Sequence, residues 1–236
     1  MTTEEARIDM RQIIVYGAGG HGKVVADIVR TMPDATLLGF VDDRTPVGAM
    51  VLGAPVLGSS GLDAPGLGAD RWLRARGADD GAEVALGIGD NHARERVAAR
   101  CVEAGFALAT LVHPTAAVSS AAVLAAGVVV MAQAAINPGA VVEEGAIINT
   151  GAVVEHDVRV GPYAHVSPHA TLAGGASVGR LSHVGAGATC LPLTSIGEDV
   201  TVGGGAVVHR AVPDRVVTAG VPARILRLKA PQPKPT

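Results

Sequence analysis

The feature that most constrains this chain is a repeat of six residues that begins after Pro114. Stepping by six from Val118, sixteen successive positions are apolar and fifteen of them are aliphatic: Val118, Leu124, Val130, Ile136, Val142, Ile148, Val154, Val160, Val166, Leu172, Val178, Val184, Cys190, Ile196, Val202 and Val208. Two places earlier, each hexad carries a small or β-branched residue, mostly alanine. Such a period is the signature of a parallel β-helix, in which each hexad forms one flat face and one corner.

Three faces close one coil of eighteen residues, so residues eighteen apart should lie above one another. The repeat then implies roughly five coils, stacked at the strand spacing of about 4.8 Å. Strands of a β-sandwich would alternate with a period of two and break at turns, and the six-residue spacing excludes them. A content of 31 glycines and only five aromatic residues agrees with a thin core of small aliphatic side chains.

The first half has a different pattern, in which strands alternate with helices. Residues 12–17 and 35–43 are predicted strands that flank an amphipathic helix at 21–32, which makes a βαβ unit. An irregular stretch at 44–80 is followed by a strand at 83–89, a helix at 90–105 and a strand at 106–113. We therefore predict a small Rossmann-like α/β domain over 11–112, with a mainly parallel sheet, and a β-helix domain over 113–229.

Charge and composition limit the partners. A formal net charge of −3 gives no broad basic surface, so we expect neither nucleic acid nor a membrane as a partner. The polar N-terminus and the absence of a long apolar run predict a cytoplasmic protein. Cys101 and Cys190 lie among apolar neighbours, which indicates buried thiols in a reducing compartment.

Three ionisable residues in a row, Glu155, His156 and Asp157, interrupt the aliphatic repeat. On adjacent coils His156 should have Pro138 on one side and Gly174 on the other, which leaves open space beside the imidazole. A carboxylate next to a histidine raises its basicity and fixes its tautomer, which suits a general base near neutral pH. The alternative is an ordinary surface histidine with two acidic neighbours, and either carboxylate is adjacent enough to orient the ring.

His165 follows His156 by nine residues, one and a half faces around the prism. Within one chain the two histidines should face away from each other, so a site that uses both would lie between subunits. His165 and His183 are eighteen apart and should stack. Such a pair fits a metal site or a polar patch at a subunit contact.

The stretch 17–22 reads Gly-Ala-Gly-Gly-His-Gly between a strand and a helix, with Asp42 and Asp43 about twenty residues later. Glycines let a phosphorylated ligand approach the backbone, and the helix N-terminus offers N–H donors. This pattern is typical of an NAD site, but the domain is short, and a nucleotide-linked sugar suits it better.

Several motifs together resemble the sialic acid O-acetyltransferase-like and bacterial nucleotide-amino-sugar N-acetyltransferase family of hexapeptide-repeat acyltransferases. They are YGAGGHGKVVADI near the start, GIGDNHAR (87–94), NTGAVVEHD (149–157), AHVSPHA (164–170), VGGGAVV (202–208) and GVPAR (220–224). The resemblance covers nearly the whole chain. It implies a left-handed β-helix, acetyl-CoA as cosubstrate without a metal, and a homotrimer with active sites between prisms.

The resemblance also implies residue roles. His156 would be the catalytic base, with Asp157 raising its basicity and Glu155 as the other adjacent carboxylate. The coenzyme would contact His165 and the backbone near Gly174, Ala186 and Gly204, and the sugar nucleotide would bind at Gly19, Gly20, His21, Asp42, Asp43 and Gly89. The implied reaction is N-acetylation of the 4-amino group of a nucleotide-linked 4-amino-4,6-dideoxy sugar for a surface glycan.

Three other functions stay open on the sequence. O-acetylation of sialic acid or another sugar hydroxyl would use the same base and coenzyme. A zinc enzyme of the carbonic-anhydrase type would use His165 and His183, but it leaves the first domain without a role. An NAD-binding sensor is supported only by the glycine loop and Asp42. The cysteines are poor nucleophile candidates, because one lies in a helix pattern and the other at an inward hexad position.

Overall fold

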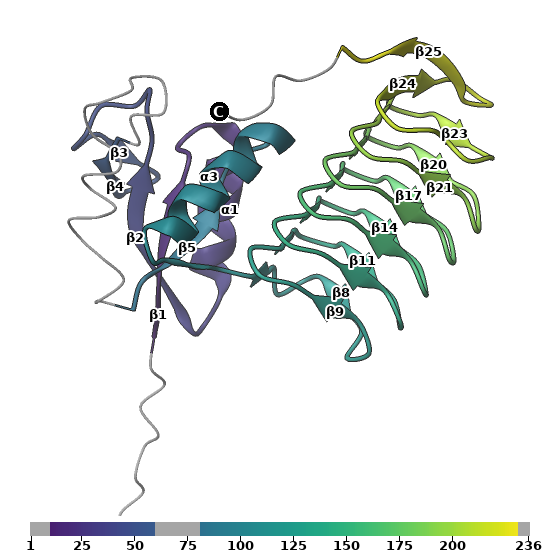
Figure 1. Ribbon diagram of the computed structural model, residues 1–236. Coiled ribbons are helices and arrows are strands. Elements are labelled where there is room, and N and C mark those ends of the chain that lie inside the picture. The colour runs from purple at the N-terminus through teal and green to yellow at the C-terminus, as the bar shows by residue number, and fades with distance from the viewer. Residues whose placement is uncertain (1–9, 60–80, 231–236) are drawn as a thin grey trace, which may run out of the picture. The chain divides into compact units, whose positions relative to one another are not determined.

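The computed structural model describes residues 10–59 and 81–230, which form two compact units (Figure 1). The first unit takes in residues up to 88 and residues 99–109, and the second takes in 89–98 and the chain from 110 onward. Part of the predicted irregular stretch, residues 60–80, lies outside the described residues. No helix within the described ranges is long and apolar enough to cross a membrane.

The first unit is built on a six-stranded sheet in the order β3-β4-β2-β1-β5-β6. Its elements are β1 (Arg11–Tyr16), α1 (Gly20–Thr31), β2 (Ala35–Val41), β3 (Met50–Val51), β4 (Ala54–Gly58), β5 (Glu83–Leu86), the end of α3 (Asn91–Glu103) and β6 (Ala107–Leu108). All pairs are parallel except β3 with β4. The central strand β1 buries Ile13, Ile14 and Val15 completely, as expected for a strand covered on both faces.

The βαβ unit and the later strand and helix confirm the sequence predictions to within a few residues. Two details were wrong. Residues 50–58 form a β3–β4 hairpin that the sequence did not reveal, because its two-residue turn uses Leu52 and Gly53, both with positive φ, where asparagine is the usual signal. The predicted strand at 106–113 is two strands that belong to different sheets, β6 and β7 (Leu111–Val112).

The second unit is a left-handed parallel β-helix, which confirms the predicted fold class. The first face contains β7, β10 (Val129–Val130), β13 (Ile147–Ile148), β16 (His165–Val166), β19 (His183–Val184), β22 (Thr201–Val202), β24 (Val216–Ala219) and the antiparallel β25 (Arg224–Leu228). The second face contains β8 (Ala117–Val118), β11 (Ala135–Ile136), β14 (Val153–Val154), β17 (Thr171–Leu172), β20 (Thr189–Cys190) and β23 (Val207–Val208). The third contains β9 (Val123–Leu124), β12 (Val141–Val142), β15 (Arg159–Val160), β18 (Ser177–Val178) and β21 (Ser195–Ile196).

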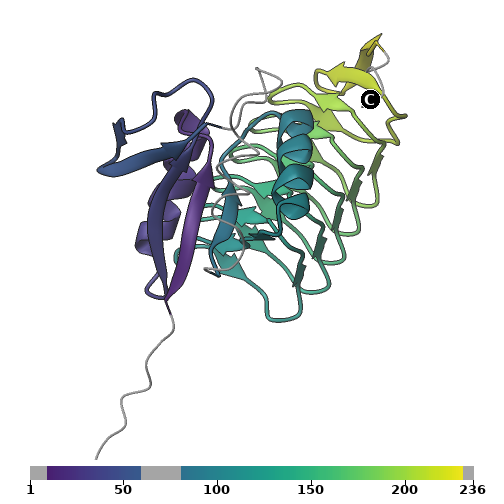
Figure 2. The same cartoon turned by 60° about the vertical axis from the view of Figure 1, so that its left-hand side comes forward.

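The interior of the prism consists of the two apolar positions of each hexad. Every predicted inward residue from Val130 to Val208 is buried, as are the alanines two places earlier, from Ala134 to Ala206. Partner residues on successive coils are eighteen apart, as for His165 opposite His183 and Val154 opposite Leu172. Figure 2 shows the stacked coils from another side.

The corners follow their own rule. We call them first (149–151 in the coil that begins at β13), second (155–157) and third (161–163). Four non-glycine residues with positive φ each lie over a glycine eighteen residues earlier: Asp157 over Gly139, Tyr163 over Gly145, His169 over Gly151 and Leu193 over Gly175. A methyl group on any of these glycines would collide with the side chain above it, at 2.3 to 2.7 Å from the nearest atom. Glycine therefore recurs at the corners for reasons of space as well as backbone conformation.

The hexad register predicts opposite outcomes for two adjacent residues of β15. Val160 is completely buried, and Arg159 points outward and is exposed. Val160→Asp should lower the free energy of unfolding by about 3 kcal/mol or more, because the carboxylate has no partner between the coils. Arg159→Asp should change it by less than about 0.5 kcal/mol. Thermal unfolding of both variants tests this, and equal stability would show that the frame is wrong.

Candidate active site

His156 and Asp157 form an exposed pair at the second corner, directly after β14. The imidazole Nδ1 lies 2.9 Å from Oδ2 of Asp157, and the two side chains are 63% and 74% exposed. Glu155 acts on the ring only through its charge. Of the two adjacent carboxylates that the sequence left open, Asp157 is the one that contacts the imidazole.

This contact determines the chemistry of the ring. A carboxylate can only accept a hydrogen bond, so Asp157 favours the tautomer with the proton on Nδ1 and the lone pair on Nε2. The pKa of His156 is raised, first by the hydrogen bond to Asp157 and further by the charges of Asp157 and Glu155. The result is a basic imidazole in open surroundings, with the geometry of a general base.

The unprotonated nitrogen faces the next coil. Nε2 lies 2.5 Å from the point where a Cβ on Gly174 would be. The gap that the sequence predicts at Gly174 is therefore present, and the imidazole ring of His156 fills it.

His165 lies on the first face and is only 7% exposed. Its Nε2 lies 2.9 Å from Nδ2 of Asn149, while Oδ1 of Asn149 accepts from the Thr150 N–H at 2.8 Å. Because that backbone donor fixes the amide, Nδ2 donates to His165, whose proton is then on Nδ1. The chain thus holds this histidine as a buried, oriented group, on the face opposite the second corner.

His183 stacks on His165 as predicted, with ring centroids 4.8 Å apart in an edge arrangement. Its Nε2 lies 3.0 Å from the Ser167 hydroxyl. Burial, with the charges of Arg94 and Lys229, lowers its pKa, so the ring is neutral at pH 7. Among residues 10–59 and 81–230 no three His, Cys, Asp or Glu side chains are grouped as metal ligands, so the zinc hypothesis gains no ligand set there.

The other residues predicted to contact the coenzyme lie at two different corners. Ala186 and Gly204 are exposed at the first corner on adjacent coils, where Ala186 O accepts from the Gly205 N–H at 2.8 Å. Gly174 lies at the second corner beside His156. A single chain therefore brings together His156 and Gly174, and keeps Ala186 and Gly204 at another edge of the prism.

The glycine loop of the first unit divides into two kinds of glycine. Gly17 and Gly22 are required by packing, since a Cβ on Gly22 would lie 1.8 Å from Gly17 O. Gly19 and Gly20 are exposed, and an added Cβ would meet nothing within 4 Å at either. His21 follows in the first turn of α1, partly exposed. Packing within the protein therefore does not require glycine at positions 19 and 20, and this edge of the loop is open.

Asp42 shapes this loop. Its Oδ2 accepts from the Ala18 N–H at 2.7 Å, and its Oδ1 accepts from the N–H groups of Arg44 and Thr45. Burial acts to raise the pKa of Asp42, but these backbone donors outweigh it and the pKa is lowered. Asp43 accepts from the Ser59 hydroxyl at 3.0 Å. Gly89 belongs to the second unit, where its carbonyl accepts from Arg94 Nη1.

The start of α3 has a role that the sequence did not show. Arg94 is completely buried and donates to the carbonyls of Gly145 and Tyr163, while Asn91 donates to that of Leu181. These three carbonyls belong to the third corner on successive coils. Burial lowers the pKa of Arg94 to about 10, so it stays charged at neutral pH. Asn91 and Arg94 belong to the motif GIGDNHAR, whose sequence alone does not reveal this structural role.

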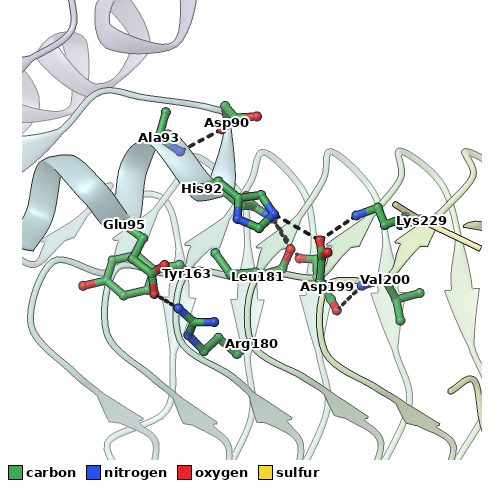
Figure 3. Close-up of polar contacts among 12 residues, drawn as sticks. Asp90, His92, Ala93, Glu95, Tyr163, Arg180, Leu181, Asp199, Val200 and Lys229 are labelled. Carbon is green, nitrogen blue, oxygen red and sulfur yellow. Dashed lines mark hydrogen bonds and ion pairs between the residues drawn. The ribbon is translucent and has the colours of Figure 1, made fainter. Parts of the chain in front are cut away.

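Charged pairs extend this contact along the stack (Figure 3). His92 Nε2 lies 3.1 Å from Asp199 Oδ1, which also accepts from Lys229 Nζ at 2.7 Å. Arg180 pairs with Glu95 in the same view. Residues 91–95 are therefore fixed along the third corner of the β-helix. Asp90 caps the helix by accepting from the Ala93 N–H.

The cysteines are excluded as nucleophiles. Cys101 and Cys190 are buried, and desolvation raises the pKa of each thiol to about 12. Both are protonated at neutral pH and unreactive.

Comparison with known proteins agrees with the fold. The PglD N-terminal domain family matches residues 12–101. The acetyltransferase domain of PglB from Neisseria gonorrhoeae FA1090, solved with acetyl coenzyme A, is 36% identical, with a TM-score of 0.83 over 92% of this chain and 100% of that one. PerB from Caulobacter crescentus, solved with CoA and GDP-perosamine, is 40% identical, with a TM-score of 0.81 over 91% of this chain and 96% of that one.

A third relative is UDP-N-acetylbacillosamine N-acetyltransferase of Bacillus subtilis (strain 168), 37% identical over 123 residues. That match spans about half of each chain, 52% of this one and 52% of the relative. The two solved structures are matched over nearly their whole length, at 36% and 40% identity. This chain belongs to the nucleotide-amino-sugar N-acetyltransferase family.

Proposed function

We propose that the chain is an acetyl-CoA-dependent N-acetyltransferase that acts on the 4-amino group of a nucleotide-linked 4-amino-4,6-dideoxy sugar, for a surface glycan. The observation that carries the proposal is the exposed His156–Asp157 pair, in which the carboxylate holds Nδ1 and leaves the Nε2 lone pair on a ring that is 63% exposed. Two relatives support the substrates, because one was solved with acetyl coenzyme A and the other with CoA and GDP-perosamine.

The reaction follows from the atoms of this pair. The sugar amine attacks the thioester carbonyl, and Nε2 of His156 takes the proton that the nitrogen must lose. Asp157, on Nδ1, stabilises the imidazolium that results. The tetrahedral intermediate then collapses to the amide, and the departing CoA thiolate takes a proton from the imidazolium. No acyl-enzyme is formed, in agreement with the two buried, protonated cysteines.

A replacement series at the pair tests the base. His156→Ala should lower kcat by roughly 10²–10⁴, the usual contribution of a general base, with the fold intact because the side chain lies outside the prism. The loss should shrink as pH rises, because more of the amine is then unprotonated. Asp157→Asn should shift the acidic limb of the pH profile to lower pH, because the pKa of His156 is raised by that carboxylate.

Steady-state kinetics with UDP-, dTDP- and GDP-linked 4-amino sugars measure these changes. Glu155→Gln is the matched control, and it should shift the limb less because Glu155 makes no hydrogen bond to the ring. Near-normal turnover of His156→Ala at all pH values would remove His156 as the base. Acetylation of sialic acid or of sugar hydroxyls in place of amines would favour the O-acetyltransferase hypothesis.

We propose that the sugar nucleotide binds at Gly19, Gly20 and His21, near the N-terminus of α1. Gly20→Ala is a clean test, since the added methyl meets no protein atom within 4 Å. It should raise KM for the sugar nucleotide and leave KM for acetyl-CoA unchanged. Asp27→Ala, exposed on the same helix, is the control and should change neither. A selective effect on acetyl-CoA would reverse the assignment of the ligands.

The NAD hypothesis rested on the glycine loop and on Asp42, and the two oxygens of Asp42 already hold three backbone N–H groups of the loop and turn. We assign Asp42 to the shape of the glycine loop, and Asp43 and Gly89 stay predicted contacts of the sugar nucleotide. This leaves the NAD-binding sensor without its one supporting side chain.

We further propose a homotrimer. His156 lies at the second corner, whereas His165 lies on the first face and Ala186 and Gly204 at the first corner, so one chain cannot bring them to one coenzyme. A neighbouring prism would supply the missing edge. Sedimentation should show a trimer, and a fully active monomer would contradict the shared site.

A further inference from the structure

The catalytic pair lies between two glycines on adjacent coils. The three protein atoms nearest to a Cβ on Gly174 all belong to the His156 ring, with Nε2 at 2.5 Å and Cε1 at 2.7 Å. The atom nearest to a Cβ on Gly139 is Oδ1 of Asp157, also at 2.5 Å. Each member of the pair thus occupies the volume that a side chain on the neighbouring coil would fill.

Among the protein atoms near Gly174, only the His156 ring requires a glycine there. Its φ lies outside the left-handed region, and no backbone atom is among the three nearest to the added Cβ. Gly161, Gly179 and Gly185, by contrast, would collide with backbone of the adjacent coil. Gly139 has a second reason to be glycine, because its φ of +76° lies in the left-handed region. Within the chain, the lack of a side chain at Gly174 therefore leaves room for the imidazole and for no other protein group.

We infer that Gly174 is a positioning residue: because it has no side chain, the His156 imidazole can lie against the adjacent coil and keep its contact with Asp157. Gly139 leaves room for the Asp157 carboxylate in the same way. The orientation of the imidazole by Gly174 does not depend on the proposed function, whereas its effect on turnover rests on that function. The pair is largely exposed and has few neighbours to orient it. The charged groups that face the ring are Glu155 and Asp157, and Pro138 and Gly174 on the flanking coils carry none.

Gly174→Ala should displace the ring without harming the fold. The colliding atoms are the end of an exposed side chain, which can rotate away, so the melting temperature should not change. Once the ring leaves Asp157, its pKa should fall toward the ordinary value of about 6.5. NMR titration of the histidines without substrates measures this, with His156→Ala used to assign the signal. Turnover should fall by about 10- to 100-fold in kcat, the effect of misplacing a catalytic group by about an ångström.

Gly175→Ala is the matched control in the same turn. Its backbone has φ +67°, and its methyl would meet only Leu193 within 4 Å. It should lower the melting temperature, because an alanine is strained there, yet leave kcat and the pKa of His156 unchanged. A second control combines Gly174→Ala with Asp157→Asn, where the pKa should fall no further than in Asp157→Asn alone, because the lost contact is the same.

The outcomes separate this inference from the proposed function. An unchanged pKa of His156 in Gly174→Ala would overturn the inference, and a raised KM for acetyl-CoA with that pKa unchanged would instead assign Gly174 to the coenzyme. A lowered pKa with normal kcat would support the positioning role and remove His156 as the base. We expect the pKa of His156 and kcat both to fall in Gly174→Ala, and both to stay unchanged in Gly175→Ala.

Discussion

The stacking of coils at eighteen residues is the constraint on which the rest of this structure depends. Parallel backbone ladders hold each coil on the next, and the inward aliphatic residues fix the register because a shift would bring outward residues inside. The same register decides what every corner side chain meets. It places the His156 imidazole against Gly174 and the Asp157 carboxylate against Gly139. The site is thus a consequence of the repeat and also an interruption of it.

The β-helix separates stability from chemistry. Its core consists of small aliphatic side chains inside the prism, whereas the His156–Asp157 pair lies on a corner and contributes nothing to that core. At this exposed corner the pKa of His156 is raised, and its ring remains accessible to solvent. The second polar group, His165 and His183 with Asn149 and Ser167, is by contrast largely buried and held by side-chain hydrogen bonds. The two histidine groups therefore differ in what they can do: one can exchange a proton with a ligand, and the other is held in a single orientation.

The start of α3 shows how a solenoid corner binds a segment from outside the repeat. Carbonyl groups of the third corner recur on successive coils, and Asn91 and Arg94 are spaced along one helix face to reach them. A buried guanidinium is costly unless its donors are satisfied, and these carbonyls satisfy several of them. This contact explains the motif at 87–94 as a structural feature of the second unit, in addition to any contact that Gly89 makes with a ligand.

The sequence by itself determined the β-helix, its inward residues, the neighbours of His156 and the α/β unit before it, because a strict period converts spacing directly into geometry. It also located the glycine loop and the exposed dyad. Only the tertiary structure decided that Asp157 contacts the ring, since Glu155 and Asp157 are equally near in sequence and the corner backbone, with φ +60° at Asp157, turns one of them toward Nδ1. It alone showed that Asp42 holds the loop, that residues 106–113 divide between two sheets, and that Arg94 is buried. The last three outcomes depend on contacts between segments far apart in the chain, for which no local pattern exists.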